Sequence, residues 1–340
     1  YQLLYLPKGI TFQSAVKGHP SVDYTGRYGM LAVTMPARLP KPDSPLGLGD
    51  LKVLEGMNDQ GLTFSLLSYP NSGGTQKTVE ATRAVLSASD LGSWALSQFA
   101  TVAELKTALS DQPVMLEALA LLGGVESPFH YVVHDEAGDA FVIEFNEGRM
   151  TTYDNPVGVM TNGPEFSWHL TNLNNYTFLT NVDRSSATFG TYTAVQPDSG
   201  VATAGLPASN TSVGRFVRAA FYSQYAEKAD TPDLAVQTLA HIMNNFDRPR
   251  GVTIDYPSEG GGHMEVAGLE ADSSTAYATE VTCWTNLSDL SRKQFHLRTY
   301  RSLNYASFDL TALAEADGRD ITTLERQRDD ALIAALKARE

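Results

Sequence analysis

Short apolar runs, each bounded by glycine, proline or asparagine, recur along the whole of this chain of 340 residues. Each is roughly 4–10 residues long and rich in Val, Thr, Phe and Tyr, which suit a pleated, half-buried surface, so each predicts a β-strand. Two pairs of runs flank polar turn clusters at 135–139 and 287–293 and therefore predict antiparallel hairpins. The predicted strands are Gln2–Leu6, 28–35, 62–69, 130–134, 141–145, 157–161, 277–286 and 294–300.

Helical periodicity is confined to other parts of the chain. Thr101 and Glu104 form a capping-box pattern that opens one helix, and a proline-rich stretch at 37–50 predicts a loop. The predicted helices are 90–99, 101–109, 215–227, 234–244 and a charged C-terminal helix at 321–338. Strands in antiparallel hairpins with helices in separate clusters indicate a layered α+β domain.

The formal net charge of −14 limits the possible partners. A sequence-independent nucleic-acid binder needs a basic surface to displace counterions, so we expect no nucleic-acid partner. No stretch approaches the ~20 apolar residues that span a bilayer, and we expect no membrane partner.

Most familiar catalytic motifs are missing from the sequence. It contains neither a phosphate-binding loop nor the G-x-S-x-G pattern of common serine hydrolases. His130 and His134 are four residues apart on a predicted strand, which places them ~13 Å apart rather than converging on a metal. We therefore expect no metal and no cofactor. Cys283 is the only cysteine. It lies in the middle of a predicted strand, and nothing nearby in sequence supplies the base or helix N-terminus that a nucleophile needs, which predicts a small apolar core residue.

Several segments, in the right order, resemble one family. Residues 55–62 read EGMNDQGL and precede LSYP at 67–70, which is similar to the DGMNEKGL and L-x-[YF]-P stretches of the choloylglycine hydrolases and penicillin V acylases. GVMTNGPEFSWH at 158–169 resembles their VLTNSPTFDWH segment. GLP at 205–207 with SVGRFVR at 212–218 resembles GLPGD and SRFVR.

This resemblance implies an αββα sandwich, with two antiparallel sheets between helical layers, of the N-terminal-nucleophile hydrolase superfamily. It also implies hydrolysis of a linear amide: penicillin V, a conjugated bile salt or an N-acyl homoserine lactone. In the family a cysteine at the mature N-terminus attacks the amide carbonyl, and its α-amino group, with a pKa near ~7.7–8.0, is the general base. Asn162 matches the asparagine of the oxyanion hole and Arg215 the arginine beside the nucleophile. Ser68 stands where bile-salt-type members carry asparagine and penicillin-type members tyrosine.

The start of the chain departs from the family pattern. Residues 1–9 resemble the stretch that follows the catalytic strand and its return strand, so we expect a strand–turn–strand unit of about 20 residues, carrying the cysteine, ahead of Tyr1. One domain is then predicted over 1–310, followed by a charged helical tail over 311–340. Two alternatives stay open: a relative without a nucleophile that binds acyl amides without turnover, and a relocated nucleophile at Cys283.

The resemblance also bears on assembly and location. The segment from Tyr176 to Asn210 is long and polar, and it resembles the projecting hairpin through which members of the bile-salt branch form tetramers, which predicts a homotetramer. Acidic relatives from Gram-negative bacteria are commonly exported, which predicts a periplasmic or secreted protein, with a cytoplasmic one as the alternative.

Overall fold

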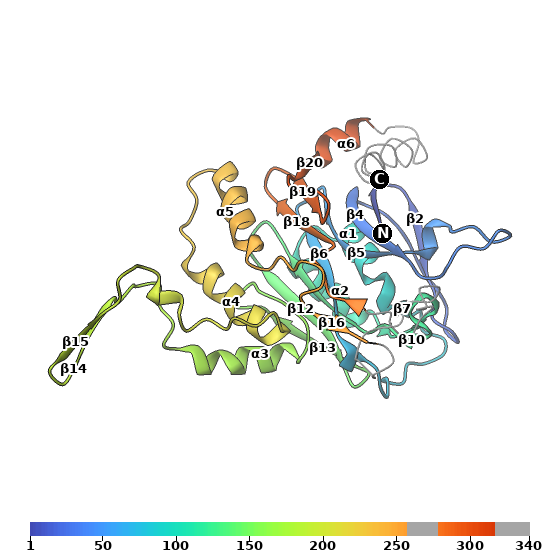
Figure 1. Cartoon of the computed structure of the whole chain (residues 1–340). Helices are drawn as coiled ribbons and strands as arrows, with labels where there is room; N and C mark the ends of the chain where they lie inside the picture. Colours follow the sequence, from blue (N-terminus) through green and yellow to red (C-terminus); the bar gives the residue numbers. More distant parts are fainter. Residues whose placement is uncertain (257–277, 317–340) are drawn as a thin grey trace.

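The computed structural model describes residues 1–256 and 278–316 (Figure 1). The predicted C-terminal helix at 321–338 and position 277 lie outside this part. Among the described residues, no helix is long and apolar enough to cross a bilayer.

A seven-stranded antiparallel sheet forms the centre of the molecule, and five of its strands overlap a predicted strand, whereas Leu51–Asn58 and Arg149–Asp154 were not predicted. Its order is β1-β4-β5-β6-β11-β12-β13. The strands are β1 (Gln2–Leu6), β4 (Met30–Pro36), β5 (Leu51–Asn58), β6 (Thr63–Ser68), β11 (Phe129–His134), β12 (Ala140–Asn146) and β13 (Arg149–Asp154).

Helices α1 (Leu91–Gln98) and α2 (Val102–Asp111) cover one face of this sheet. The approach of α1 is close: a Cβ added at Gly92 would lie 2.8 Å from the Val53 side chain of β5. One half of the predicted capping box is confirmed, since Thr101 Oγ1 accepts from the Glu104 amide at 3.2 Å. The other half differs, because the Glu104 carboxylate accepts from the amide of Ala100, at 2.8 Å, rather than from that of Thr101. This end of α2 is therefore fixed by the local sequence.

The opposite face packs against two different layers. Over β11 and β12 lie α3 (Phe166–Asn172) and α4 (Ser212–Tyr225), whose Phe166 and Phe216 join a separate apolar cluster with Val132 and Val142. Over β5 lies a second sheet of β18 (Trp284–Asp289), β19 (Gln294–Thr299) and β20 (Ala306–Asp309). Helix α5 (Pro232–Asn244) packs on β18. The order helix, sheet, sheet, helix is the predicted αββα sandwich.

One predicted strand is wrong, and a second is wrong in part. Residues 157–161 form no strand, because the carbonyls of Gly158 and Thr161 bond to the side chains of His134 and His130 instead of to a neighbouring strand. The segment 277–286 is interrupted: β17 (Ala278–Thr279) pairs with β16 (Ile254–Asp255), and β18 begins only at Trp284. Between them the Thr282 amide bonds to the Arg248 carbonyl, at 3.1 Å, which breaks the ladder.

The remaining elements are short and lie at the periphery. Residues 176–210 leave the body as an arm that ends in the hairpin of β14 and β15 (Figure 1). The predicted loop at 37–50 holds one single-turn 3₁₀ helix, Leu48–Asp50. The other elements are β2 (Thr11–Ser14), β3 (Val22–Thr25), β7 (Leu86–Ser87), β8 (Val114–Met115), β9 (Ala118–Leu119), β10 (Val125–Glu126), β14 (Ser186–Phe189), β15 (Tyr192–Val195), α6 (Leu310–Ala316) and the 3₁₀ helices Pro70–Ser72, Ala88–Asp90, Ala120–Leu122, Leu173–Tyr176 and Val201–Thr203.

Candidate active site

The three site residues predicted from the sequence lie together. Asn162 follows an irregular segment rather than a strand, and its Nδ2 donates to the carbonyl oxygen of Ser68 at 2.8 Å. Nη2 of Arg215 donates to Oδ1 of the same carboxamide at 2.6 Å. These two contacts fix the orientation of the amide, because each end meets a partner of opposite polarity. Ser68 contributes to this arrangement through its backbone carbonyl.

Arg215 belongs to the first turn of α4, which Thr211 caps by accepting from the Gly214 amide at 3.2 Å. Its Nε donates to the Asn210 carbonyl at 3.0 Å, so the loop before the helix holds the guanidinium in place. Burial, together with the nearby guanidiniums of Arg248 and Arg218, lowers the pKa of Arg215 to about 10. The guanidinium is still charged at neutral pH, and the positive potential around it favours an anion.

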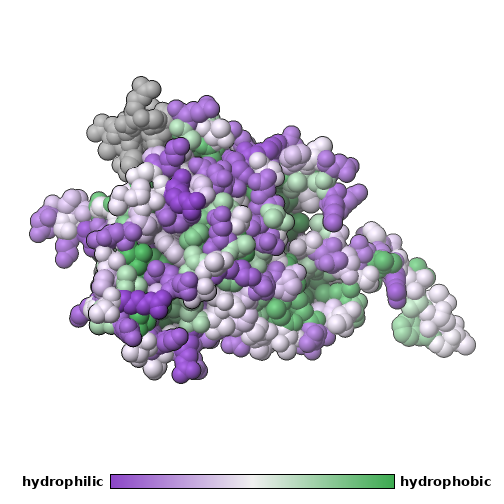
Figure 2. Space-filling view, turned by 180° about the vertical axis from the view of Figure 1, so that it is seen from behind, coloured by the Kyte–Doolittle hydropathy of each residue, from purple (hydrophilic) through white to green (hydrophobic). Residues whose placement is uncertain are grey.

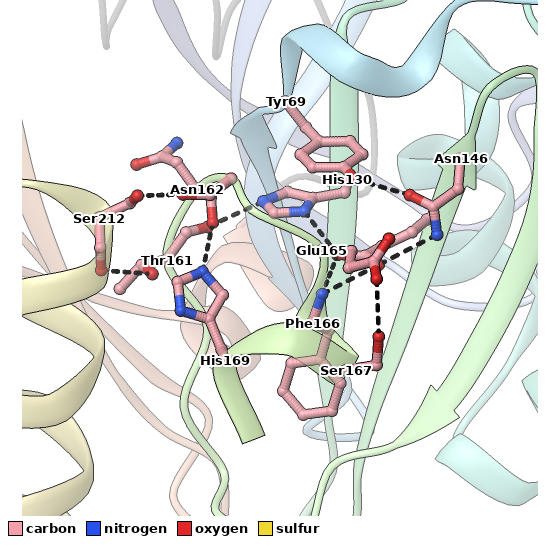
Figure 3. A network of polar contacts seen from close by, with 12 residues as sticks. Tyr69, His130, Asn146, Thr161, Asn162, Glu165, Phe166, Ser167, His169 and Ser212 are labelled. Atoms are coloured by element: carbon pink, nitrogen blue, oxygen red, sulfur yellow. Dashed lines mark hydrogen bonds and ion pairs between the residues drawn. The ribbon is translucent and has the colours of Figure 1, made fainter. Parts of the chain in front are cut away.

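A buried polar network lies behind Asn162 (Figure 3). His130 Nδ1 contacts Glu144 Oε1 at 3.0 Å, and His130 Nε2 contacts the Thr161 carbonyl at 2.8 Å. The ring of Tyr69 stacks on that of His130 with centroids 4.7 Å apart, and its hydroxyl donates to Asn146 Oδ1 at 2.6 Å. The network therefore supports the residue immediately before Asn162.

A second set of contacts supports Asn162 from the helical side. His169 Nε2 donates to the Asn162 carbonyl at 2.8 Å, and its ring stacks on Phe216 of α4 with centroids 4.5 Å apart. Thr161 Oγ1 donates to the Ser212 carbonyl at 3.0 Å, and the Ser212 hydroxyl donates to the Gly163 carbonyl. Helices α3 and α4 thus hold both sides of the loop.

Sequence reasoning did not assign these supporting residues to the site. His130 was weighed only as a metal ligand, and Glu144 was counted as part of an apolar run. The available signal was an ionisable residue inside each of two strands that are otherwise apolar, FHYVV and FVIEF. Such residues are rarely buried without a partner.

Cys283 is not the core residue that its neighbours in sequence predict. It is exposed and lies in the break between β17 and β18, with its Sγ 3.7 Å from the Val281 carbonyl. The prediction fails because the expected strand is interrupted and β18 begins only at Trp284. Within residues 1–256 and 278–316, no cluster of three or more His, Cys, Asp or Glu side chains could hold a metal ion.

Comparison with known proteins places this arrangement in context. Residues 43–261 match the family of linear amide C–N hydrolases known as the choloylglycine hydrolase family. The chain belongs to this family. It is 24% identical over 270 residues to a bile salt hydrolase/transferase of Clostridium perfringens, a match that covers 79% of this chain and 75% of the relative.

Solved structures agree with the fold of this choloylglycine hydrolase family member. A variant of conjugated bile acid hydrolase from Clostridium perfringens superposes with a TM-score of 0.71 at 21% identity, covering 94% of this chain and 85% of the other. Penicillin V acylase from Agrobacterium tumefaciens superposes with a TM-score of 0.64 at 21% identity, covering 92% and 78%. The fold is that of the N-terminal-nucleophile hydrolases.

Glu55 gives this family member an unusual carboxyl group between the two sheets. It lies on β5, is half-buried, and accepts a hydrogen bond from Nε1 of Trp284 at the start of β18. Burial raises the pKa of Glu55 to about 7, against the opposing effect of the Trp284 hydrogen bond. The folded protein therefore binds a proton at this site in a pH range where an ordinary carboxyl is ionised.

Replacing Glu55 with glutamine should change how stability depends on pH. Because the folded-state pKa is above the ordinary value of 4.5, the stability that the bound proton contributes is complete below pH ~4.5 and is lost as the pH rises through about 7. We expect the free energy of unfolding of the wild type to fall between pH 5 and pH 8 relative to that of Glu55→Gln. Denaturant titrations of both proteins at these pH values test this, and parallel curves would contradict it.

Proposed function

We propose that this protein hydrolyses the amide bond of a small acyl-amide substrate with a cysteine nucleophile that precedes Tyr1 in the natural protein. Membership of the linear amide C–N hydrolases supports the reaction class. The cysteine thiol would attack the amide carbonyl while its own α-amino group, with a pKa near ~7.7–8.0, takes the thiol proton. The oxyanion formed at the carbonyl oxygen then needs hydrogen-bond donors.

The orientation of the Asn162 carboxamide is the observation that carries the proposal. Arg215 bonds to its oxygen and Ser68 accepts one of the two protons on Nδ2. The second proton on Nδ2 can therefore be given to an oxyanion. The charged guanidinium of Arg215 polarises the amide from its oxygen side, which makes the N–H a better donor, and favours the thiolate over the thiol.

The second sheet supports a place for the nucleophile. Within the described residues, β18 pairs with β19 on one edge and with no strand on the other. Arg215, Arg218 and Arg248 form an arginine cluster, because the latter two are close enough to lower the pKa of Arg215. Residues just before β18 adjoin this cluster, since the Arg248 amide donates to Thr282 Oγ1 at 2.9 Å. A strand added along the open edge of β18 would carry its cysteine toward this cluster.

N-terminal sequencing of the natural protein, followed by product-release assays, tests the proposal. The substrates are penicillin V, glycocholate and an N-acyl homoserine lactone. We expect a mature N-terminal cysteine and hydrolysis of at least one substrate that iodoacetamide abolishes. Binding of these compounds without turnover would overturn the proposal in favour of a ligand-binding relative, which is the reading suggested by Cys283 being the only cysteine in this chain.

Cys283 itself is not expected to act as the nucleophile. Its exposed thiol contacts a backbone carbonyl, whereas a nucleophilic cysteine needs a base or a cationic partner. We expect Cys283→Ser to keep kcat within about twofold of the wild type, in line with other exposed substitutions. Steady-state kinetics measure this, and loss of turnover would assign the nucleophile to Cys283.

We further propose that the protein is exported.

We also propose that the arm over residues 176–210 joins copies of this chain into a homotetramer. Figure 2 shows the arm standing clear of the body. Apolar side chains on it are largely exposed, with Phe189 and Tyr192 at 69% and Val195 at 67%. An exposed apolar surface of this kind is typical of an interface.

The double variant Phe189→Ser/Tyr192→Ser should therefore dissociate. It removes the two large side chains that flank the hairpin turn, so we expect light scattering to report the mass of one chain where the wild type gives about four times that value. The control Thr193→Ser changes an exposed side chain in the same hairpin and should leave the mass unchanged. A wild-type protein that is monomeric at micromolar concentration would contradict the tetramer.

A further inference from the structure

His130 and Glu144 form a pair in the interior of the protein. The register of β11 against β12, with Tyr131 opposite Ile143, brings the two side chains together on one face of the sheet. Both are 0% exposed, and Nδ1 of His130 lies 3.0 Å from Oε1 of Glu144. Two ionisable groups without access to water must satisfy each other's hydrogen bonds and charge.

Both ring nitrogens of His130 face acceptors. Nδ1 faces the Glu144 carboxyl group and Nε2 faces the Thr161 carbonyl, at 2.8 Å. A neutral imidazole has only one N–H, so it would leave one of these contacts without a proton unless Glu144 carried it. The histidine or the glutamate must therefore hold an additional proton.

The surroundings of Glu144 place that proton on the histidine. Both carboxyl oxygens accept from the Phe166 amide, at 2.9 and 3.1 Å, and the group lies at the N-terminus of α3, where negative charge is favoured. Tyr69 stacks flat on the His130 ring, with an interplanar angle of 3°, and offers its π-face to a cation. The Phe166 amide therefore matches an ionised carboxylate at Glu144, and the Tyr69 ring matches an imidazolium at His130.

Other titratable groups near the pair leave this assignment intact. Tyr69 and Tyr153 lie close to Glu144, Glu165 lies close to these two tyrosines, and His169 lies close to both members of the pair. Burial lowers the pKa of His169, so this ring is neutral and does not compete for the role of cation. Arg215 faces His169 from α4, and its own bonds go to Asn162 and Asn210.

We propose that His130 is an imidazolium at neutral pH and that the His130–Glu144 ion pair positions Asn162. The imidazolium holds the Thr161 carbonyl, immediately before Asn162, and the carboxylate holds the Phe166 amide, four residues after it. The pair thereby clamps both ends of the loop that carries the carboxamide. Neither side chain touches the substrate; both are positioning residues. Their catalytic consequence rests on the proposed function, whereas the protonation state does not.

Nuclear magnetic resonance of the chain labelled with ¹⁵N at histidine tests the protonation state. His134 is a matched control, because it lies on the same strand and face but has one ring contact, to the Gly158 carbonyl at 3.1 Å, and burial lowers its pKa. At pH 8 we expect protons on both ring nitrogens of His130 and on only one of His134. Glu144→Gln should remove one proton from the His130 ring. A bare nitrogen on His130 in the wild type, or two protons on it in Glu144→Gln, would overturn the inference.

Kinetics of the full-length enzyme test the positioning. A displacement of the carboxamide by about 1 Å costs on the order of 10²-fold in rate, so we expect His130→Gln to lower kcat by that factor with KM nearly unchanged. His134→Gln should stay within twofold of the wild type. An unchanged kcat in His130→Gln would refute the positioning role. If the wild-type enzyme hydrolyses no amide, the proposed function fails while the resonance result still decides the charge on His130.

Discussion

Alanine in place of Asn162 is expected to lower kcat by about 10²- to 10³-fold, which corresponds to ~2.7–4 kcal/mol of transition-state stabilisation. The reason is geometric. Arg215 and Ser68 fix the carboxamide so that one proton on Nδ2 is free for the oxyanion that develops at the substrate carbonyl. That hydrogen bond strengthens only as negative charge develops, so kcat and kcat/KM should fall together and KM should change little.

Steady-state kinetics with the substrate that is turned over fastest measure this effect. Asn174→Ala is the matched control, because it removes an exposed asparagine just after α3 and should leave kcat within twofold. Arg215→Met should lower kcat as well, since it releases the oxygen of the carboxamide and removes the charge beside it. A loss of less than about threefold in Asn162→Ala, or one confined to KM, would show that Asn162 does not stabilise the transition state.

Removal of Glu144 should cause the largest loss of stability. We expect Glu144→Ala to lower the free energy of unfolding by ~3–5 kcal/mol, because the buried His130 ring loses its counter-charge and must give up a proton, and the Phe166 amide loses its acceptor. This is a large part of the ~5–15 kcal/mol that stabilises a typical domain.

Equilibrium denaturation compares this variant with two others. Glu165→Ala removes an exposed acid one residue before α3 and should change the free energy of unfolding by no more than ~0.5 kcal/mol. The double variant His130→Leu/Glu144→Leu should be more stable than Glu144→Ala, since it removes both charges and fills the space with apolar atoms. A loss below ~1 kcal/mol in Glu144→Ala would mean that His130 and Glu144 are not an ion pair.

The sequence was most informative where structure depends on neighbouring residues. Short apolar runs identified five of the seven central strands, because a continuous apolar run is a local signal of a buried strand. Strands β5 and β13, which carry charged and polar residues, were not predicted. The cap at Thr101 was confirmed because its partner, the Glu104 amide, lies only three residues away. The ordered motifs identified the family. Through the family they also predicted the fold and the proximity of the Asn162 and Arg215 side chains.

Long-range hydrogen bonds account for what the sequence did not reveal. Residues 157–161 have the composition of a strand, but the carbonyls of Gly158 and Thr161 are taken by the side chains of His134 and His130. Cys283 was expected in the middle of a strand, but that strand is interrupted because Thr282 bonds to Arg248. In both cases the partner is chosen by packing rather than by local pattern.

The sequence alone therefore determined the family, the layered fold and two side chains of the candidate site. Only the tertiary structure decided that His130 and Glu144 lie buried beside each other, 14 residues apart in the chain, and that together they hold the ends of the Asn162 loop. The physical reason is that a residue's type fixes which face of a strand it can occupy, whereas its charge and hydrogen bonds depend on groups brought to it from distant parts of the chain.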